Sequence, residues 1–235
     1  TGATGLHIVG PSGDDLAVFL ANSRAIEPVG RKLLEVFSSN VALGYDNAAL
    51  LDRVRSLAYY DPLTRLPNRV LLQERAEARL ATLGEGERLG LFMLDLDHFK
   101  RVNDRYGHQV GDLCLKHLAG IASGHLRAAD QLARYGGEEF VLLLPDTDAR
   151  QAHCLTERIR SAVAGSTVHS EQGVIRLTLS AGIAGIDPAD ENIEQLIRRA
   201  DLALYAAKAA GRNRSRMHSA AIAGLAELSG LQQAR

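Results

Sequence analysis

The strongest constraint on the fold comes from a glycine pair in the stretch Arg-Tyr-Gly-Gly-Glu-Glu-Phe at 134–140. It joins two apolar runs, 131–135 and 140–144. Such an arrangement predicts a β-hairpin, because tight turns need positive φ and glycine adopts it freely. Two adjacent carboxylates, Glu138 and Glu139, follow the turn, although acids are poor strand formers and repel each other. A solvated hairpin tip and a cation-binding site both accommodate such a pair, and these residues alone leave the choice open.

A second pair of acids ends the apolar run 91–97. The period of a strand places Asp95 and Asp97 on one face, and the apolar run itself indicates a central strand that is covered on both faces. Buried acids are costly unless they are paired or bound to metal. If this strand lies beside the hairpin, Asp95 and Glu138 converge on one hard cation. Ligands that are all oxygen favour Mg²⁺ or Mn²⁺.

Composition narrows the class of protein. The 235 residues are enough for one sizeable core and a smaller element, and a formal charge of −1 argues against a nucleic-acid surface. The two cysteines, Cys114 and Cys154, fall in apolar helical patterns and are expected to be buried free thiols, which fits a reducing, cytoplasmic compartment. No apolar run reaches membrane-spanning length, and no signal peptide is visible. Because the chain starts at Thr-Gly, we expect a fragment of a longer protein.

The N-terminal part divides into two segments. In residues 1–27, short apolar runs at 6–9 and 16–21 flank Gly-Pro-Ser-Gly and predict two strands and a turn. Two strands do not make a stable domain, so we interpret them as a partial sensory element, by weak analogy GAF-like. Residues 28–60 then predict one long helix that starts at Pro28.

A heptad-like stripe runs along the helix 28–60. Its positions alternate spacings of three and four: Leu34, Phe37, Val41, Gly44, Ala48 and Leu51. This spacing favours a coiled-coil seam with a second chain, and the alternative is an amphipathic helix packed on its own domain.

The order of elements after the Asp-Pro break at 61–62 predicts an α+β fold. A helix at 70–83, capped by Asn68, precedes a surface loop. The elements that follow are strand 90–96, helix 110–124, strands 131–135 and 139–144, helix 149–164, strand 174–182 and helix 192–210, with a small hairpin at 165–173. This order predicts a ferredoxin-like βαββαβ sheet with helices on one face. The tail 217–235 has a loose Ala/Leu helical pattern.

Several motifs in this region share the order and spacing of a known family. They are Asp95-Leu96-Asp97-His98-Phe99-Lys100-Arg101-Val102-Asn103-Asp104, then Tyr106-Gly107-His108, Gly111-Asp112, Gly136-Gly137-Glu138-Glu139-Phe140 and Gly211-Arg212-Asn213. From about 61 to 216 the chain resembles the GGDEF domain of diguanylate cyclases, in the GGEEF variant of the signature loop. The resemblance implies a palm-like nucleotidyl-cyclase fold. It also implies condensation of two GTP molecules into cyclic di-GMP with release of two pyrophosphates. Arg65 stands where many members have glycine.

The resemblance implies a metal-dependent active site. Side chains of Asp95 and Glu138 and the carbonyl of Leu96 would bind Mg²⁺ or Mn²⁺, with two ions in each site. Glu138 would also be the base, and Glu139 is a further candidate for contact with a metal or hydroxyl. Lys100 would stabilise the phosphate that is transferred.

The implied phosphate site combines backbone amides with cations. His98, Phe99 and Lys100 follow the strand where a turn into a helix exposes N–H groups. Lys208 and Arg212 are four residues apart, which predicts one shared helix face, and in the family they hold the terminal phosphates. From the residues alone, a solvated helix end is the preferred interpretation of this pair.

Two further sites follow from the resemblance. Asn103 and Asp112 match the positions that read guanine, although Asp112 is also an ordinary acid near a helix N-terminus. Arg127, Asp130 and Arg158 match the inhibitory site that binds the cyclic di-GMP product, where arginine clamps phosphate and aspartate accepts from guanine.

The condensation needs two GTP sites that face each other, so we expect a homodimer through the helix 28–60. Two other interpretations remain open. One is a catalytically silent module that binds cyclic di-GMP through Arg127, Asp130 and Arg158, and the other is a different nucleotidyl cyclase on the same fold. We expect no nucleic-acid partner, and no membrane segment within this chain.

Overall fold

The computed structural model describes residues 2–9, 15–22, 27–84, 86–187 and 192–228. The chain forms two compact units, residues 1–58 and 59–235. Each unit is described by itself. Among the described residues, none of the helices combines the length and apolar character needed to cross a membrane.

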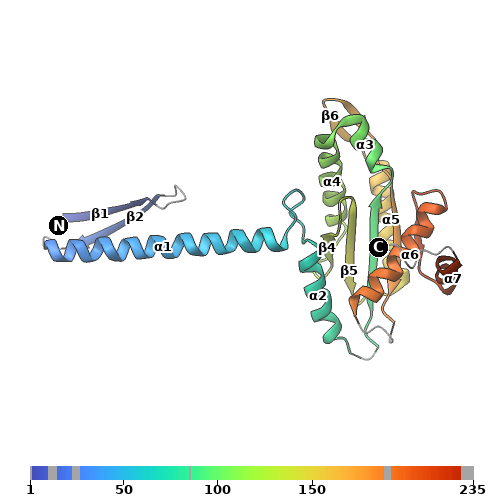
Figure 1. Ribbon diagram of the computed structural model, residues 1–235, viewed down its shortest axis with the longest axis horizontal. Helices are drawn as coiled ribbons and strands as arrows, with labels where there is room; N and C mark the ends of the chain where they lie inside the picture. The colour runs from blue at the N-terminus through green and yellow to red at the C-terminus, as the bar shows by residue number, and fades with distance from the viewer. Residues whose placement is uncertain (1, 10–14, 23–26, 85, 188–191, 229–235) are drawn as a thin grey trace. The chain divides into compact units, whose positions relative to one another are not determined.

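The first unit holds a hairpin and a long helix (Figure 1). Strands β1 (Gly2–Val9) and β2 (Asp15–Asn22) pair antiparallel, as predicted, over longer spans than the sequence indicated. The predicted turn between them lies outside the described residues. Helix α1 (Pro28–Tyr59) begins at the expected proline.

One narrow stripe of α1 is covered. Ser38 is buried, and residues at steps of four from it are partly buried, namely Gly30, Leu34, Ala42 and Asp46. The other residues from 27 to 58 are exposed. A helix with one covered stripe and many exposed apolar side chains has a second face available for packing.

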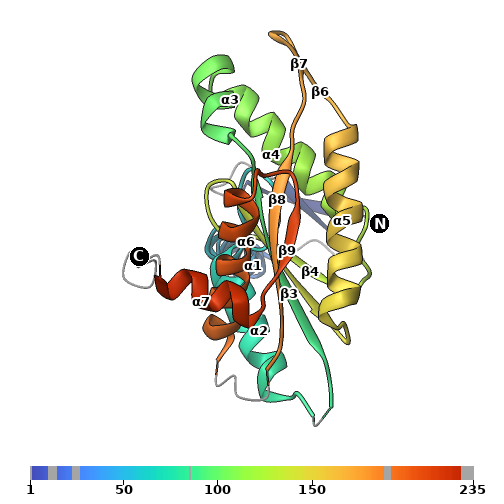
Figure 2. The ribbon, with the colours of Figure 1, turned by 90° about the vertical axis from the view of Figure 1, so that its right-hand side faces the viewer.

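The second unit is built on a five-stranded sheet in the order β4-β5-β3-β8-β9 (Figure 2). Its strands are β3 (Leu89–Leu96), β4 (Gln131–Arg134), β5 (Glu139–Pro145), β8 (Leu179–Gly185) and β9 (Ser215–Met217). The first four pair antiparallel, and β8 pairs parallel with β9. The order of β3, β4, β5 and β8 is that of a ferredoxin-like βαββαβ sheet, which confirms the predicted fold class.

Helices cover both faces of this sheet. The helices of this unit are α2 (Arg69–Ala81), α3 (Phe99–Tyr106), α4 (His108–Ser123), α5 (Ala149–Gly165), α6 (Ile193–Ala209) and α7 (Ala220–Leu228). Phe92 and Leu94 of β3 belong to the core formed with α4 and α5, whereas Leu91 and Met93 belong to the core formed with α2 and α6. The prediction of helices on one face only is therefore wrong. The reason is visible in β3, which is buried at every position and so needs cover on both sides.

Helix α6 lies unusually close to the sheet at Gly182 of β8. A Cβ built on Gly182 would lie 2.0 Å from the carbonyl oxygen of Ala200 and 2.1 Å from the amide nitrogen of Leu204. Real Cβ atoms do not approach backbone so closely, so this position admits only glycine. The missing side chain sets the distance between β8 and the helix that carries Lys208 near its end.

Several local predictions need correction. The predicted strand 174–182 is two strands, because β7 (Gly173–Ile175) pairs with β6 (Val168–Ser170) before β8 begins. Strand β9 was not predicted, since its three residues show no apolar alternation. Cys114 is buried, and burial raises the pKa of its thiol to about 11, but Cys154 is exposed. The prediction that both thiols are buried is therefore wrong for Cys154. The cap by Asn68 is confirmed by its bond from the Leu71 amide, 3.1 Å.

Candidate active site

The signature stretch forms the predicted hairpin between β4 and β5, but neither Gly136 nor Gly137 has the positive φ on which the prediction relied. The amides of Tyr135 and Gly136 donate to the carbonyl of Glu139 over 2.8 and 3.2 Å. A Cβ on Gly136 would lie 2.6 Å from the Glu139 carboxylate, so a side chain there would displace that acid. The turn therefore uses its first glycine to make room for Glu139.

The hairpin lies beside the strand that carries Asp95. Asp95 is directly opposite Glu139 in the β3–β5 register, so the two side chains share a face of the sheet. The Asp95 carboxylate is 5% exposed and lies 2.7 Å from the ammonium of Lys208 on α6. The structure thus brings together two strands and one helix at this point, as the sequence predicted for Asp95 and the hairpin.

Electrostatics at this cluster disfavour its negative charges. Burial raises the pKa of Asp95, against the opposing hydrogen bond from Lys208. Burial also raises the pKa of Glu138, and the Asp95 and Glu139 charges raise it further. Three acids with one ammonium leave net negative charge in a partly desolvated place, which is the condition that a divalent cation relieves.

The donor set fits a hard cation. In the part of the chain that the structure describes, no three His, Cys, Asp or Glu side chains are gathered as a metal cluster. The expected set uses only two side chains, Asp95 and Glu138, with the backbone carbonyl of Leu96, so it does not require such a cluster. Oxygen donors of this kind suit Mg²⁺ or Mn²⁺.

Asp97 has a structural place next to this cluster. Its carboxylate accepts hydrogen bonds from the hydroxyls of Thr178 and Ser180, 2.8 and 2.7 Å, and from the amide of Asn213, 2.9 Å. These bonds satisfy the buried charge without a metal. Asp97 therefore fixes the backbone at Asn213.

The turn after β3 leads directly into α3. His98 is exposed and left-handed, with φ 59°, and Phe99 is 7% exposed and anchors the helix start in the core. Lys100 is exposed on the first helical turn. Because the first amides of a helix have no intrahelical acceptor, this turn offers N–H groups to an anion.

The predicted guanine-reading residues lie on α3 and α4. Asn103 Oδ1 is buried without a hydrogen-bond partner, while Asp112 is exposed. A Cβ on Gly111 would lie 1.9 Å from that Oδ1, so Gly111 makes the space that the amide occupies. The sequence motif contained Gly111, but its role became visible only from the packing.

The pair predicted to bind the terminal phosphates, Lys208 and Arg212, differs in geometry from the prediction. Helix α6 ends at Ala209, and Arg212 lies beyond it in a left-handed conformation with φ 61°. The prediction that Lys208 and Arg212 share a helix face is therefore wrong. Gly211, with φ 109°, ends the helix and redirects the chain before Arg212.

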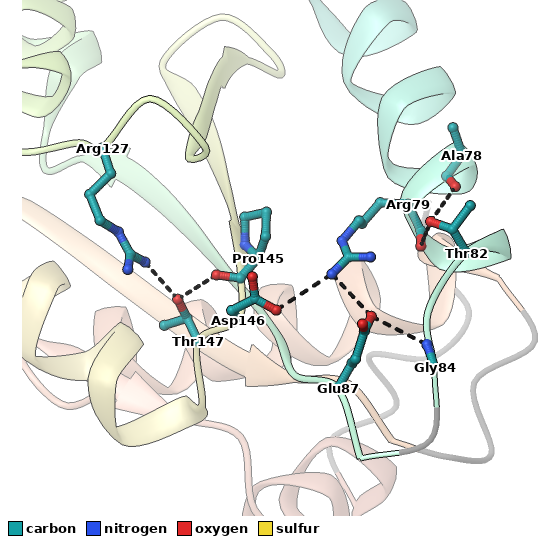
Figure 3. A network of polar contacts seen from close by, with 9 residues as sticks. All are labelled: Ala78, Arg79, Thr82, Gly84, Glu87, Arg127, Pro145, Asp146 and Thr147. Atoms are coloured by element: carbon teal, nitrogen blue, oxygen red, sulfur yellow. Dashed lines mark hydrogen bonds and ion pairs between the residues drawn. The ribbon is translucent and has the colours of Figure 1, made fainter.

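The three residues of the predicted product site line one hollow of about 370 Å³. Arg127 donates to the Asp130 carboxylate over 3.3 Å. It also donates to the hydroxyl of Thr147 over 2.9 Å (Figure 3). The Asp130 side chain is 1% exposed, whereas that of Arg127 is 65% exposed. Arg158 reaches the hollow from α5, so the structure brings the set Arg127, Asp130 and Arg158 together.

One ion pair that sequence reasoning missed ties the signature turn to the Asp61 turn. Arg134 lies 2.9 Å from the Asp61 carboxylate and donates to the carbonyl of Gly137 over 2.7 Å. Asp61 also accepts from the amide and hydroxyl of Thr64. Despite burial, these bonds and the Arg134 charge lower the pKa of Asp61. Arg65, with φ 62°, completes this turn, which explains why glycine suits that position.

Comparisons with known proteins agree with this geometry. The family model described as "Diguanylate cyclase, GGDEF domain" matches residues 58–214, and a model for a domain of unknown function, DUF3369, matches residues 1–54. Among curated proteins, the chain is 47% identical over 165 residues to diguanylate cyclase DgcP of Pseudomonas aeruginosa. It is 40% identical over 167 residues to response regulator PleD of Caulobacter vibrioides. These alignments cover 70% and 69% of the chain but only 24% and 37% of the relatives' lengths.

Solved structures show the same fold. The coiled coil and GGDEF domain of DgcB from Caulobacter crescentus, solved with c-di-GMP, matches with TM-score 0.73 and 31% identity, covering 79% of this chain and 98% of that one. An active GGEEF domain of a diguanylate cyclase from Vibrio cholerae matches with TM-score 0.61 and 34% identity, covering 65% and 97%. The family model covers more than half of the chain, and the chain belongs to the GGDEF family of diguanylate cyclase domains.

Proposed function

We propose that this chain is a diguanylate cyclase that condenses two GTP molecules into cyclic di-GMP and releases two pyrophosphates. The observation that carries the proposal is the meeting of Asp95, Glu138 and Lys208 beside an amide-bearing turn. Asp95 and Glu138 can bind cations, Glu138 can also act as a base, and the Lys208 ammonium can bind phosphate. A reaction at phosphorus needs alignment and charge stabilisation more than covalent help from the protein.

Each group has a definable task in this proposal. Asp95, Glu138 and the Leu96 carbonyl hold Mg²⁺ or Mn²⁺, two ions in each site, which would neutralise phosphate charge and lower the pKa of the ribose 3′-hydroxyl. Glu138 accepts the hydroxyl proton as general base. Glu139 shares the face of Asp95 and provides a further acceptor.

Phosphate and guanine are bound on either side of that cluster. The amides of His98, Phe99 and Lys100, with the Lys100 ammonium, contact the transferring phosphate, while Lys208 and Arg212 hold the terminal phosphates. The unpartnered Oδ1 of Asn103 accepts from the guanine donor edge, together with the Asp112 carboxylate. A GTP substrate places the reaction in the cytoplasm.

The condensation requires two sites, and the dimer is proposed to form through α1. The stripe expected from the sequence includes Leu34, which lies on the covered side of the helix. A strict alternation of three and four begins one residue earlier, and its positions are all exposed: Leu33, Val36, Asn40, Leu43, Asn47, Leu50, Val54 and Leu57. In this register leucine occupies three of the four d positions and asparagine two of the four a positions, a pattern of parallel two-stranded coiled coils.

The dimer proposal has a direct test. Charged substitutions at two d positions, Leu43→Lys with Leu50→Lys, should give a monomer by light scattering and abolish product formation. The matched control, Glu35→Lys with Asp52→Lys, changes exposed acids outside the seam and should leave the dimer intact. A strict monomer that makes product at the parent's full rate would refute the proposal.

Product inhibition is proposed at the hollow lined by Arg127, Asp130 and Arg158. Arginine guanidinium groups bind phosphate in pairs and stack on guanine, and the nearly inaccessible Asp130 fixes the orientation of Arg127. Arg158→Ala should weaken inhibition by added cyclic di-GMP at least about tenfold, which is 1.4 kcal/mol of binding free energy. Turnover without added product should stay unchanged, because Arg158 lies outside the catalytic cluster.

The function itself is tested with GTP and Mg²⁺ by following pyrophosphate and cyclic di-GMP together, beside a Glu138→Ala control. Product from the parent and none from the control supports the cyclase. A silent receptor predicts no turnover, with cyclic di-GMP binding that survives Glu138→Ala and disappears with Arg127→Ala. A nucleotide panel separates a guanine-specific enzyme from another nucleotidyl cyclase.

A further inference from the structure

The turn that carries Arg212 has an uncommon backbone. Gly211, Arg212 and Asn213 have φ values of 109°, 61° and 44°. Two successive non-glycine residues in the left-handed region cost about 1–3 kcal/mol each, so contacts elsewhere must hold them there. The direction of the Arg212 side chain depends on this backbone, and the holding contacts therefore matter to the phosphate site.

Asn213 is held from both its backbone and its side chain. Its amide donates to Asp97 over 2.9 Å, and Asp97 is fixed in turn by Thr178 and Ser180. Its side-chain Oδ1 accepts from the Arg160 guanidinium over 2.8 Å. Arg160 belongs to α5, on which no predicted active-site residue lies.

A second residue of α5, Glu157, holds the Arg160 side chain in place. Glu157 accepts from Arg160 Nε over 2.9 Å and from the hydroxyl of Ser215 over 2.5 Å. The Arg160 side chain is 19% exposed and that of Glu157 is 34% exposed. Arg160 and Glu157 of α5 therefore bind two residues that follow Arg212 in the chain, Asn213 and Ser215. The backbone of Arg214 adds a third, because its carbonyl accepts from the Ala181 amide over 3.0 Å.

We propose that Arg160 and Glu157 are positioning residues that hold the left-handed turn and thereby aim Arg212 at the terminal phosphates of GTP. This inference rests on the proposed function in one respect, that Arg212 meets phosphate. Neither residue touches the nucleotide in this proposal. Their loss should weaken contacts to the β- and γ-phosphates and spare those to guanine, which lie on α3 and α4.

The test compares two nucleotides that cannot react, the 5′-triphosphate and 5′-monophosphate of 3′-deoxyguanosine. Arg160→Ala should weaken binding of the triphosphate at least about tenfold and of the monophosphate less than about twofold. A merely structural role would weaken both equally. Arg150→Ala, an exposed arginine in the first turn of the same helix, is the matched control and should change neither.

Two substitutions of Asn213 distinguish the effect of its backbone conformation from the effect of its side-chain contact with Arg160. Asn213→Gly removes the acceptor of Arg160 but keeps the left-handed conformation without strain, whereas Asn213→Ala removes both. We expect triphosphate affinity in the order parent, Asn213→Gly, Asn213→Ala. Equal losses in the two variants, or no change in Arg160→Ala, would overturn the positioning role. Selective loss of triphosphate binding in a chain that makes no cyclic di-GMP would support the inference and count against the cyclase. A parent that binds neither nucleotide overturns both.

Discussion

Two groups of carboxylates in the second unit are well separated in sequence and lie in opposite electrostatic surroundings. Asp61 and Glu157 accept hydrogen bonds from arginine and hydroxyl groups, and their pKa values are lowered despite burial. Asp95 and Glu138 have raised pKa values, with Lys208 as the ammonium that opposes this. The first group stabilises the fold through its bonds, while the burial of the second group disfavours its charges, and a bound cation would relieve this cost. The opposite directions of the pKa shifts distinguish acids that stabilise the fold from acids that are candidates for binding a ligand.

The largest expected effect is on activity. Asp95→Asn should lower the rate of cyclic di-GMP formation at least about 100-fold, the size seen when a group that stabilises developing charge is removed. The free energy of unfolding without metal should not fall, because a desolvated charge is removed and Lys208, with a 32% exposed side chain, can be hydrated. Asp104→Asn, an exposed acid of the same motif, is the control. Full turnover in Asp95→Asn would show that Asp95 is not a functional acid, and the proposed contrast with Asp61 and Glu157 would be wrong.

The opposite result is expected for Asp61. Asp61→Asn should lower the free energy of unfolding in urea by about 2 kcal/mol, since both partners of its ion pair with Arg134 are only 16% exposed. Glu87→Gln removes the comparable but more exposed partner of Arg79 and should change stability by less than about 0.5 kcal/mol. Equal effects of the two substitutions would show that burial does not govern these pairs.

A smaller effect is expected from Gly111→Ala. The new methyl group would displace the Asn103 amide, so KM for GTP should rise about tenfold, or 1.4 kcal/mol, while kcat changes little. Helix α4 itself should tolerate alanine, which is a better helix former than glycine. Gly120→Ala, where nothing lies within 4 Å of the new Cβ, is the matched control. An unchanged KM would show that Asn103 does not contribute to guanine binding.

The smallest effect concerns pH. Raised pKa values mean that Asp95 and Glu138 favour the metal-free fold when protonated, a contribution that is lost as pH rises above about 4 through their folded values. Asp61 and Glu157 act in the reverse sense, and their contribution is lost as pH falls through their lowered values. The double variant Asp95→Asn with Glu138→Gln should therefore gain stability with rising pH more steeply than the parent. Urea unfolding between pH 4 and 7, without divalent cations, measures the two slopes, and parallel slopes would contradict the assignment.

Local patterns predicted much of this molecule. The Gly-Gly hairpin, the all-buried strand at Asp95 and the strand order follow from short-range chemistry, because turn residues and apolar runs act within a few positions. The features that were not predicted from the sequence depend on contacts between residues that are far apart along the chain. Strand β9 exists because Ser215 meets Ala181 in register, and the left-handed Arg212 is held by Asp97 and by α5. Cys154 is exposed because its side of α5 turns toward the hollow at Arg127.

The absent side chain at Gly182 bears on how this site can move. With backbone atoms of α6 and β8 in direct contact, the helix has no compressible layer of side chains beneath it at that point. A shift of α6 relative to the sheet would have to open a void or drive main chain into main chain. The Lys208 end of the helix and the Asp95 end of the sheet then travel as one piece. We therefore expect any adjustment to substrate and product to occur in the loops at the edges of this packed pair rather than between α6 and β8.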